Sequence, residues 1–402
     1  MGRDATTGGG GSGGAGRGWA APRWVRLAMA ALLLFPLLVL HRHFDAHHGF
    51  LGMIFFGRNF EQKWLPEVRA LQPPADSARG YDGQLYAQLV LDPALRRPEL
   101  AAALDVPSYR ARRIALPALA SGLGLGRTGW SLQAYALLNL PFWAALAWGV
   151  VRYTGARRWR DAALAASLLA GTGSLVSVER ALTDLPAAVL CAFAVLFRGG
   201  AGWAQGVSLA AAALTKETSL LCFPAAGWPA DGGPRGWARA VVQWILMAAP
   251  LALWMAYVAC RLPHGPVAGA GAFAWPGAAL AGKLTGAVAG LADLARGLPR
   301  HLLLSRIFEV LAPFSLVVQA AHFLVRPRPR DPAWRMGVGF VALMLVLGPQ
   351  IWIEQQAYTR TLLPMTFAFN LQLHDGGTPR GYAAWCCAGN AGMVWMALTL
   401  LA

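Results

Sequence analysis

Residues 130–151 read WSLQAYALLNLPFWAALAWGVV and contain no charged side chain. A bilayer core about 30 Å thick is crossed by a helix of ~20 residues, so this stretch is long enough to span a membrane. Backbone groups in lipid must form their hydrogen bonds within the protein, which only helices and closed barrels achieve. The chain shows no alternation typical of barrel strands. We therefore predict an all-α, polytopic integral membrane protein.

The composition extends this prediction to the whole chain. Of its 402 residues, 56% are hydrophobic and 13% are charged, whereas soluble domains carry roughly 25% charged residues. Further apolar segments lie near 24–40, 162–178, 183–198, 203–215, 217–229, 239–260, 301–325, 336–353, 361–374 and 382–401. We expect about ten or eleven membrane helices. The two short segments beside Lys216 are candidates for broken or tilted helices that line a cavity.

The N-terminal region divides into a tail and an anchor. Residues 1–22 are rich in glycine and poor in apolar side chains, which predicts a disordered cytoplasmic tail. Residues 24–40 follow Arg17 and Arg23, the charge layout of a signal anchor. A cleaved signal peptide is the alternative, but no convincing small-residue cleavage site precedes the histidines that follow. Residues 23–402 are predicted to form a single transmembrane domain.

The basic residues predict the orientation of the helices. The 35 basic and 19 acidic residues give a net charge of +16, which is compatible with nucleic acid or with a membrane surface. Arginines crowd the short loops 151–160 and 325–335, and Arg235 and Arg239 lie in a third loop. Basic short loops stay in the cytoplasm, so a nucleic-acid partner is not needed to explain the charge.

This orientation predicts that the intervening loops face the outer side of the membrane, which is the periplasm or exterior if the protein lies in a bacterial plasma membrane, as the family resemblance described below implies. The first outer loop then spans residues 42–110 and holds eight of the 19 acidic residues. The turns near 179–184 and 216–218 and the loops 261–300 and 354–360 lie on the same side. The apolar run within 112–126 is short and contains proline, so we predict an interfacial helix in the outer leaflet.

One stretch of the first outer loop, GYDGQLYAQLVLDP (80–93), is a candidate for chemistry. Four of its apolar side chains recur at helical spacing: Tyr81, Leu85, Leu89 and Val90. This pattern predicts an amphipathic helix on the membrane surface with Asp82 at its N-terminal end. Beside Gln84 and Tyr86, this carboxylate could accept a proton from a hydroxyl. A solvated loop is the simpler alternative.

Two other segments place charges at the ends of predicted spans. Arg180 and Asp184 are four residues apart and would share one helix face, where an ion pair joining two helices is the alternative to a functional role. A lysine at the bilayer centre costs ~2.5 to 3.5 kcal/mol, so Lys216 should face a cavity or a partner. Adjacent helical residues do not face each other, and Lys216 or Glu217 is therefore expected to point elsewhere.

Arg360, in QQAYTRTLLPMTF (355–367), lies at the outer mouth of another predicted helix. An interfacial anchor is the alternative reading of this arginine. In the predicted topology it shares the outer side with Asp82, Arg180 and Lys216. A carboxylate surrounded by cations suits a reaction in which a phosphate leaves while a hydroxyl attacks.

Five motifs together resemble those of the multi-spanning GT-C glycosyltransferases, which use polyprenyl-phosphate-linked sugars. They are YDGQLY (81–86), YRARRIALP (109–117), ERALTDLP (179–186), LTKETSLL (214–221) and TRTLLP (359–364). The chain looks most similar to a bacterial branch described as cell-surface glycopolymer formation proteins. The resemblance implies that Asp82 is the catalytic base. It also implies that the basic residues bind the lipid phosphate, and Asp184 is expected to orient a cation. The candidates for binding the lipid phosphate or substrate are Tyr81, Gln84, Tyr86, Arg112, Arg113, Arg180, Asp184, Lys216, Glu217 and Arg360.

The expected function is transfer of a hexosyl or pentosyl group from a polyprenyl-phosphate donor to a glycan or lipid hydroxyl. A transporter or lipid flippase is an alternative, although it predicts two similar halves that the sequence does not show. A catalytically inactive subunit of a glycan assembly complex is another. No cofactor is required by the motifs, but HRHFDAHH (41–48) could hold a divalent metal through His43, Asp45 and His47. An interfacial histidine cluster is the alternative there.

Overall fold

The computed structural model describes residues 22–75, 77–197, 202–229, 233–262, 271–295, 300–376 and 378–401. The tail predicted over residues 1–22 lies outside them except for Pro22. Within the described residues the fold is entirely helical, with three isolated β-bridges and no sheet. The predicted all-α class is thereby confirmed.

Helices succeed one another along the whole chain. Those of the N-terminal half are α1 (Arg23–Ala31), α2 (Leu34–His43), α3 (Pro66–Ala70), α4 (Gly83–Leu91), α5 (Leu100–Ala103), α6 (Pro107–Arg110), α7 (Ala115–Leu123), α8 (Thr128–Leu137), α9 (Asn139–Thr154), α10 (Trp159–Leu169), α11 (Thr172–Glu179) and α12 (Asp184–Leu196). Those of the C-terminal half are α13 (Gly202–Thr215), α14 (Pro234–Arg261), α15 (Ala278–Ala295), α16 (Arg300–Val325), α17 (Pro332–Val346), α18 (Pro349–Ile353), α19 (Gln355–Thr361), α20 (Leu363–His374), α21 (Pro379–Asn390) and α22 (Trp395–Leu401). Short 3₁₀ helices are η1 (Leu51–Ile54), η2 (Arg58–Lys63), η3 (Glu217–Ala225) and η4 (Ala391–Met393).

Several helices are long and apolar enough to cross a bilayer. In the described residues there are four: Arg23–His43, Thr128–Thr154, Pro234–Arg261 and Leu303–Val325. Counting each of two bent helix pairs as one span, α10 with α11 (46°) and α21 with α22 (63°), raises the number to six. These helices make the chain a multi-pass membrane protein. The predicted total of about ten or eleven is larger because segments such as α12, with 13 residues, reach only about 20 Å.

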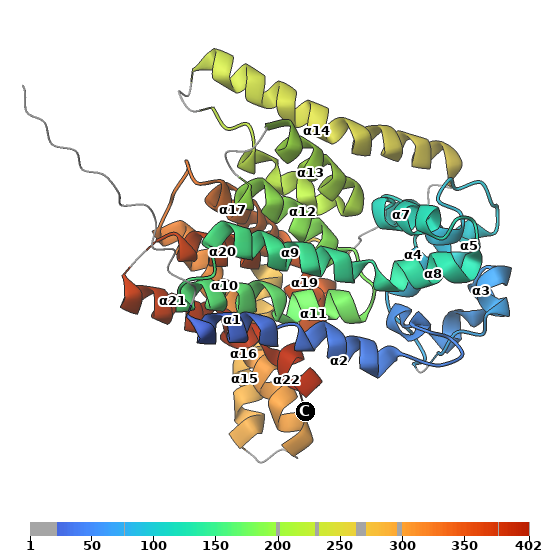
Figure 1. Cartoon of the computed structure of the whole chain (residues 1–402), viewed down its shortest axis with the longest axis horizontal. Helices are drawn as coiled ribbons and strands as arrows, with labels where there is room; N and C mark the ends of the chain where they lie inside the picture. The colour runs from blue at the N-terminus through green and yellow to red at the C-terminus, as the bar shows by residue number, and fades with distance from the viewer. Residues whose placement is uncertain are drawn as a thin grey trace, which may run out of the picture.

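The longest helix, α14, runs along one edge of the molecule (Figure 1). Its outward side chains include Val242, Ile245, Leu246 and Leu253, which are between 55% and 73% exposed. Apolar surface on this scale is costly in water and favourable in lipid. The exposed face of α14 therefore supports its assignment as a membrane helix.

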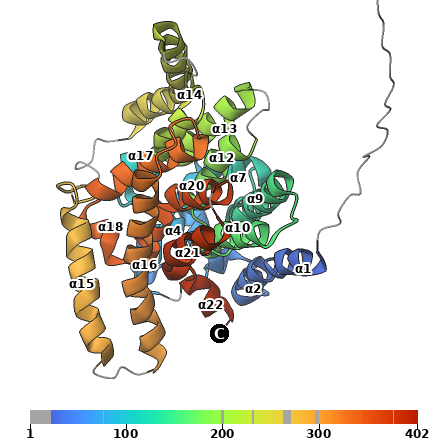
Figure 2. The same ribbon diagram turned by 90° about the vertical axis from the view of Figure 1, so that its left-hand side faces the viewer.

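Two predicted segments differ from the structure. Residues 217–229 do not form an α-helical span. They form the 3₁₀ helix η3, which contains Pro224, and irregular backbone follows η3. The predicted outer loop 261–300 contains α15, an 18-residue helix that runs beside α16 (Figure 2). The prediction of a loop there is wrong, because α15 is about as apolar on average as α13, which had been predicted as a span.

The segment 112–126 contains α7, which has nine residues. At 1.5 Å per residue this helix is about 13 Å long, less than half of a bilayer core. Helix α7 packs against α4 and α8. The predicted short helix is therefore present, and its interfacial position in the outer leaflet stays a prediction.

Helix α4 starts next to Asp82 as predicted, but it does not lie on a surface. All residues from 83 to 90 are buried, because α7, α8 and η1 pack around the helix. Its polar side chains face inward to hold the preceding loop. Gln84 Oε1 accepts a hydrogen bond from Gly57 N at 3.0 Å, and Gln88 Oε1 accepts one from Leu65 N at 2.9 Å. The predicted amphipathic surface helix is therefore wrong, since both faces of α4 are covered.

Gly83, the first residue of α4, has no room for a side chain. A Cβ atom there would lie 2.6 Å from Arg180 O and 2.8 Å from Ile54 O. Gly83→Ala is expected to push α4 away from α11 and lower the free energy of unfolding by about 1 to 3 kcal/mol. The midpoint of thermal unfolding in detergent, followed by tryptophan fluorescence, measures this loss.

Gly122→Ala in α7 is the matched control, because a Cβ atom there meets nothing within 4 Å. Alanine favours a helix over glycine by up to about 1 kcal/mol, so this variant should be neutral or slightly more stable. Equal unfolding midpoints for the two variants would contradict the tight fit at Gly83.

Candidate functional site

Four charged side chains from distant segments form one continuous chain of ion pairs. Arg360 lies between two carboxylates: its Nη2 is 2.5 Å from Asp82 Oδ2 and its Nη1 is 3.0 Å from Asp184 Oδ2. The other oxygen of Asp184, Oδ1, accepts a hydrogen bond from Lys216 Nζ at 2.5 Å. The Asp184 side chain is 1% exposed and that of Asp82 is 22% exposed. The chain of pairs therefore runs from a buried end at Lys216 to a more accessible end at Asp82.

Arg110 binds the free oxygen of Asp82. Its Nη2 lies 3.1 Å from Asp82 Oδ1, and its guanidinium makes two hydrogen bonds to the Asp105 carboxylate at 2.8 and 2.7 Å. Burial by itself would raise the pKa of Asp82, but the charges of Arg110 and Arg360 outweigh it and hold that pKa well below its usual range. Asp82 is therefore an ionised carboxylate near neutral pH.

A second cluster surrounds Arg113. Its Nε and Nη2 donate to the two Glu217 oxygens at 2.9 and 2.8 Å. Its Nη1 donates to Tyr86 Oη at 2.7 Å and its Nη2 to Tyr109 Oη at 2.5 Å. Because Lys216 pairs with Asp184 and Glu217 with Arg113, the expectation that these neighbours do not pair with each other is confirmed.

Arg180 lies beside the ion-pair chain without joining it. Its guanidinium stacks on the rings of Tyr81 and Phe55, at 4.3 and 4.9 Å from their centroids. The guanidinium of Arg360 also lies near the Tyr81 ring, 5.3 Å from its centroid. Arg180 Nε is buried and has no hydrogen-bond partner among the described residues.

The spacing of Arg180 and Asp184 predicted that they share one helix face. This prediction is wrong. Arg180 is the C-cap of α11 and Asp184 begins α12. Between them Ala181 has a φ of +47°, the left-handed conformation in which an α-helix cannot continue. The break turns the two side chains toward different partners, although both remain at the same site.

The predicted site residues divide into two groups. Those that the structure brings into the ion-pair chain, the Arg113 cluster or contact with them are Tyr81, Asp82, Tyr86, Arg113, Arg180, Asp184, Lys216, Glu217 and Arg360. Gln84 is not among them, because its Oε1 and Nε2 bind Gly57 N and Arg79 O. Arg112 is half-buried and makes no ion pair within the described residues.

Arg110 is a site residue that the sequence prediction missed, as is its neighbour Tyr109, which accepts a hydrogen bond from Arg113. Arg110 lies in the same motif, YRARRIALP, from which Arg112 and Arg113 had been chosen. Residues three apart on a helical turn face the same side, and Arg110 and Arg113 have this spacing. Helical spacing within the motif was therefore the signal that favoured Arg110 over Arg112.

The residues proposed for a metal do not gather. His43 Nε2 lies 3.5 Å from Glu179 Oε1. Asp45 Oδ1 instead accepts hydrogen bonds from the backbone N–H groups of His47 and His48, at 2.9 and 2.7 Å. In the part of the chain that the structure describes, no three His, Cys, Asp or Glu residues are placed to hold a metal ion.

An apolar groove of about 650 Å³ opens close to the Arg113 cluster. Its lining comes from α14, from the chain that follows α4, and from the ends of α7 and α13: Pro93, Ala94, Ile114, Leu214, Pro250, Leu253, Trp254 and Tyr257. Ile114 directly follows Arg113 in the chain, and Leu214 lies two residues before Lys216. Hydrogen bonds from Trp254 Nε1 to Ala111 O, at 2.8 Å, and from Tyr257 Oη to Ala94 O, at 2.7 Å, attach α14 to this region. The charged site and the apolar groove are thus neighbours.

Comparison of the chain with protein-family models, curated proteins and solved structures gave no match.

Proposed function

We propose that this chain is a GT-C-like membrane glycosyltransferase of a bacterial plasma membrane. It transfers a sugar from a polyprenyl-phosphate carrier to a hydroxyl of a cell-surface glycan or lipid on the outer face. The observation that carries the proposal is the ion-pair chain Asp82–Arg360–Asp184–Lys216. It combines a partly accessible carboxylate with two cations, and Leu214, two residues before Lys216, lines the apolar groove. The five motifs that resemble the GT-C family supply most of these side chains.

The proposed reaction is a single displacement at the anomeric carbon. The acceptor oxygen forms a bond to that carbon while the bond from the carbon to the phosphate oxygen breaks. The electron pair of the broken bond stays on the polyprenyl phosphate, whose added negative charge is stabilised by Arg360, Arg113 and Lys216. The acceptor proton passes to Asp82. Asp184 holds Arg360 and Lys216 in place.

The charges around Asp82 couple donor binding to base strength. Burial raises the pKa of this carboxyl, whereas Arg110 and Arg360 lower it. A phosphate that draws Arg360 away removes one of the positive charges that lower the pKa of Asp82, while Arg110 and Arg113 remain, and this pKa then rises. The carboxylate becomes a stronger base when the donor is in place, which favours transfer to the acceptor.

The apolar groove fits the carrier lipid. A prenyl chain is a branched hydrocarbon that gains ~25 cal/mol per Å² of apolar surface removed from water. A chain in this groove would reach past Ile114 toward Arg113 and end with its phosphate near the cations.

A transfer assay in proteoliposomes tests this function. The probes are polyprenyl phosphates carrying a labelled hexose or pentose, with a glycan and glycolipid fraction of bacterial membranes as acceptor. We expect labelled acceptor and free polyprenyl phosphate in equal amounts. Movement of the intact donor across the bilayer without release of polyprenyl phosphate would instead support a flippase. If no probe is either transferred or moved across the bilayer, the result would support an inactive subunit.

A pair of substitutions on α14 serves as the control for the lipid groove. Leu253 lines the groove and Ile245 does not, yet both side chains are largely exposed, at 73% and 61%. Leu253→Gln and Ile245→Gln therefore change insertion of α14 similarly. Only Leu253→Gln should raise the donor concentration needed for half-maximal transfer, and an equal effect of both would contradict the groove's role.

A further inference from the structure

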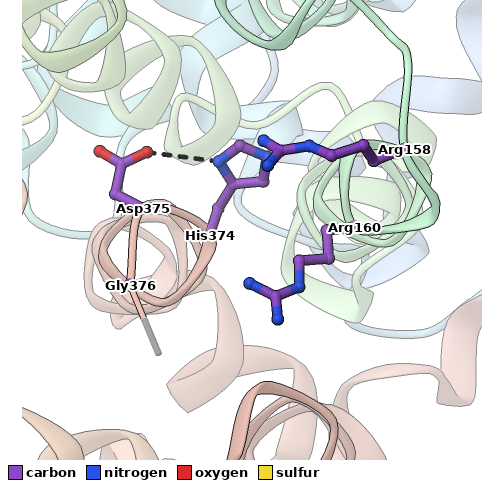
Figure 3. A pocket seen from close by; sticks show the side chains of 5 residues that line it. All are labelled: Arg158, Arg160, His374, Asp375 and Gly376. Carbon is purple, nitrogen blue, oxygen red and sulfur yellow. Dashed lines mark hydrogen bonds and ion pairs between the residues drawn. The ribbon is translucent and has the colours of Figure 1, made fainter. Parts of the chain in front are cut away.

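A second cavity, of about 350 Å³, lies away from the ion-pair chain (Figure 3). Its lining consists of Arg158, Arg160, His374, Asp375 and Gly376. These residues come from the start of α10 and the end of α20. Four of the five lining residues have ionisable side chains, whereas the groove beside α14 is lined mainly by apolar side chains.

Helices α9 and α20 run from the region of the ion-pair chain to this cavity. Arg360 precedes α20 and His374 ends it, and the 12 residues of α20 span about 18 Å. At the start of α9, Asn139 Nδ2 donates to Leu182 O at 3.0 Å, close to Asp184. At its other end, Tyr153 Oη donates to Asp375 Oδ2 at 2.6 Å. The cavity and the ion-pair chain therefore lie at opposite ends of this helix group.

The two most basic of the three basic loops meet here. Arg158 and Arg160 belong to the loop 151–160. Arg328, of the loop 325–335, reaches Gly376 so closely that a Cβ atom on this glycine would lie 2.4 Å from Arg328 Nη2. Basic loops that only orient a membrane protein act through their number of charges and need no cavity between them.

The acidic side chains at the cavity already have partners. Asp161 is fully buried and its Oδ1 lies 2.8 Å from His374 Nε2. Asp375 Oδ2 accepts a hydrogen bond from the Tyr153 hydroxyl, and Asp375 Oδ1 lies 3.3 Å from His374 Nδ1. In Figure 3 the Asp375 carboxylate is on one side of the imidazole ring, and Arg158 and Arg160 reach toward the other.

The two arginines differ in how firmly they are held. Arg160 stacks on the Tyr382 ring at 4.7 Å, which fixes its guanidinium. Arg158 is 63% exposed and reaches Asp161 at 3.7 Å through Nε. A planar guanidinium offers paired donors that match the oxygens of a phosphate group.

From this arrangement we propose that the cavity between α10 and α20 is a binding site for a phosphate group, held by Arg158 and Arg160. The group belongs to an anionic phospholipid headgroup or to a soluble phosphate. Either source supplies two or more oxygens for the guanidinium donors. The cavity volume of about 350 Å³ is large enough for a phosphate group. The site is independent of sugar transfer at the other end of the helices.

Thermal unfolding of the full chain tests the proposal with two probes. The first is inorganic phosphate, added to protein in nanodiscs of phosphatidylcholine. The second is phosphatidylglycerol, mixed into the same nanodiscs at constant ionic strength. Because a ligand that binds the folded state stabilises it, we expect one of the probes to raise the unfolding midpoint by about 3 to 5 °C.

The variant Arg158→Gln/Arg160→Gln should lose this rise, whereas Arg152→Gln, an exposed arginine of the same basic loop that does not line the cavity, should keep it. A rise with phosphate identifies a soluble ligand, and a rise with phosphatidylglycerol alone identifies a lipid headgroup. If neither probe raises the unfolding midpoint, the proposal is overturned. An equal response of the double variant and the wild-type chain overturns it as well.

Discussion

Asp82→Asn is expected to lower sugar transfer by about 10²- to 10⁴-fold, the usual contribution of a general base. Asparagine has nearly the same shape and keeps an oxygen that can accept from Arg360 or Arg110, but it cannot take the acceptor's proton. The proteoliposome assay with labelled polyprenyl-phosphate sugars measures the loss, and binding of polyprenyl phosphate should remain. Transfer by this variant at the wild-type rate would exclude Asp82 as the base.

Asp105→Asn is the matched control for this loss. Asp105 also binds Arg110, but it lies farther along the loop and makes no contact with Arg360. Its substitution should change transfer only a few-fold.

The pH dependence adds an independent check on Asp82. A carboxyl whose folded-state pKa is lowered stays ionised down to that pKa, and its stabilising ion pairs are lost only as the pH falls below its usual range. Because Arg110 and Arg360 lower the pKa of Asp82 despite its burial, kcat/KM should show no acid limb from Asp82 between pH 5 and pH 7.

Asp184→Ala is expected to reduce the free energy of unfolding by about 3 to 5 kcal/mol, the typical cost of removing one partner of a buried ion pair. Asp184 is 1% exposed and binds Lys216 and Arg360. Its loss leaves the ammonium of Lys216, itself 7% exposed, without a counter-charge. Thermal or denaturant unfolding in detergent measures the change.

Two comparison variants separate the buried charge from a general effect of substitution. Asp184→Leu/Lys216→Met replaces the pair by apolar side chains of similar volume and should recover much of the stability. Glu67→Ala removes a partner of the exposed pair Arg97–Glu67, whose side chains are 40% and 37% exposed and lie outside the membrane helices. Its cost should stay below about 1 kcal/mol. If Asp184→Ala were no more destabilising than Glu67→Ala, the ion-pair chain would not stabilise the fold.

The charged residues of the site could be recognised in the sequence because each is unusual where it stands. Lys216 follows an apolar run in a chain whose other basic residues are mostly arginine. Burying such a group costs free energy unless it has a partner, so a partner was expected before its identity was known. Asp82 was placed correctly at the start of a helix by the periodicity of the residues after it.

Other features depended on local geometry that residue types do not reveal. The left-handed Ala181 separates Arg180 from Asp184, although alanine ordinarily favours a continuing helix. Gln84 looked like a ligand for substrate, but its amide holds the backbone of the loop before α4. Helix α15 was predicted as part of a loop although it is apolar on average, and it packs against α16 in the structure.

The sequence by itself determined the helical membrane class, because apolar length and the hydrogen-bonding requirement of lipid leave few other structures. It also determined which charged residues needed partners. The tertiary structure alone decided the pairing. Arg360 and Asp82 are 278 positions apart, and Arg360 and Asp184 are 176 apart. Ion pairs across such separations depend on how the helices between them pack, and this packing brings one guanidinium within reach of both carboxylates.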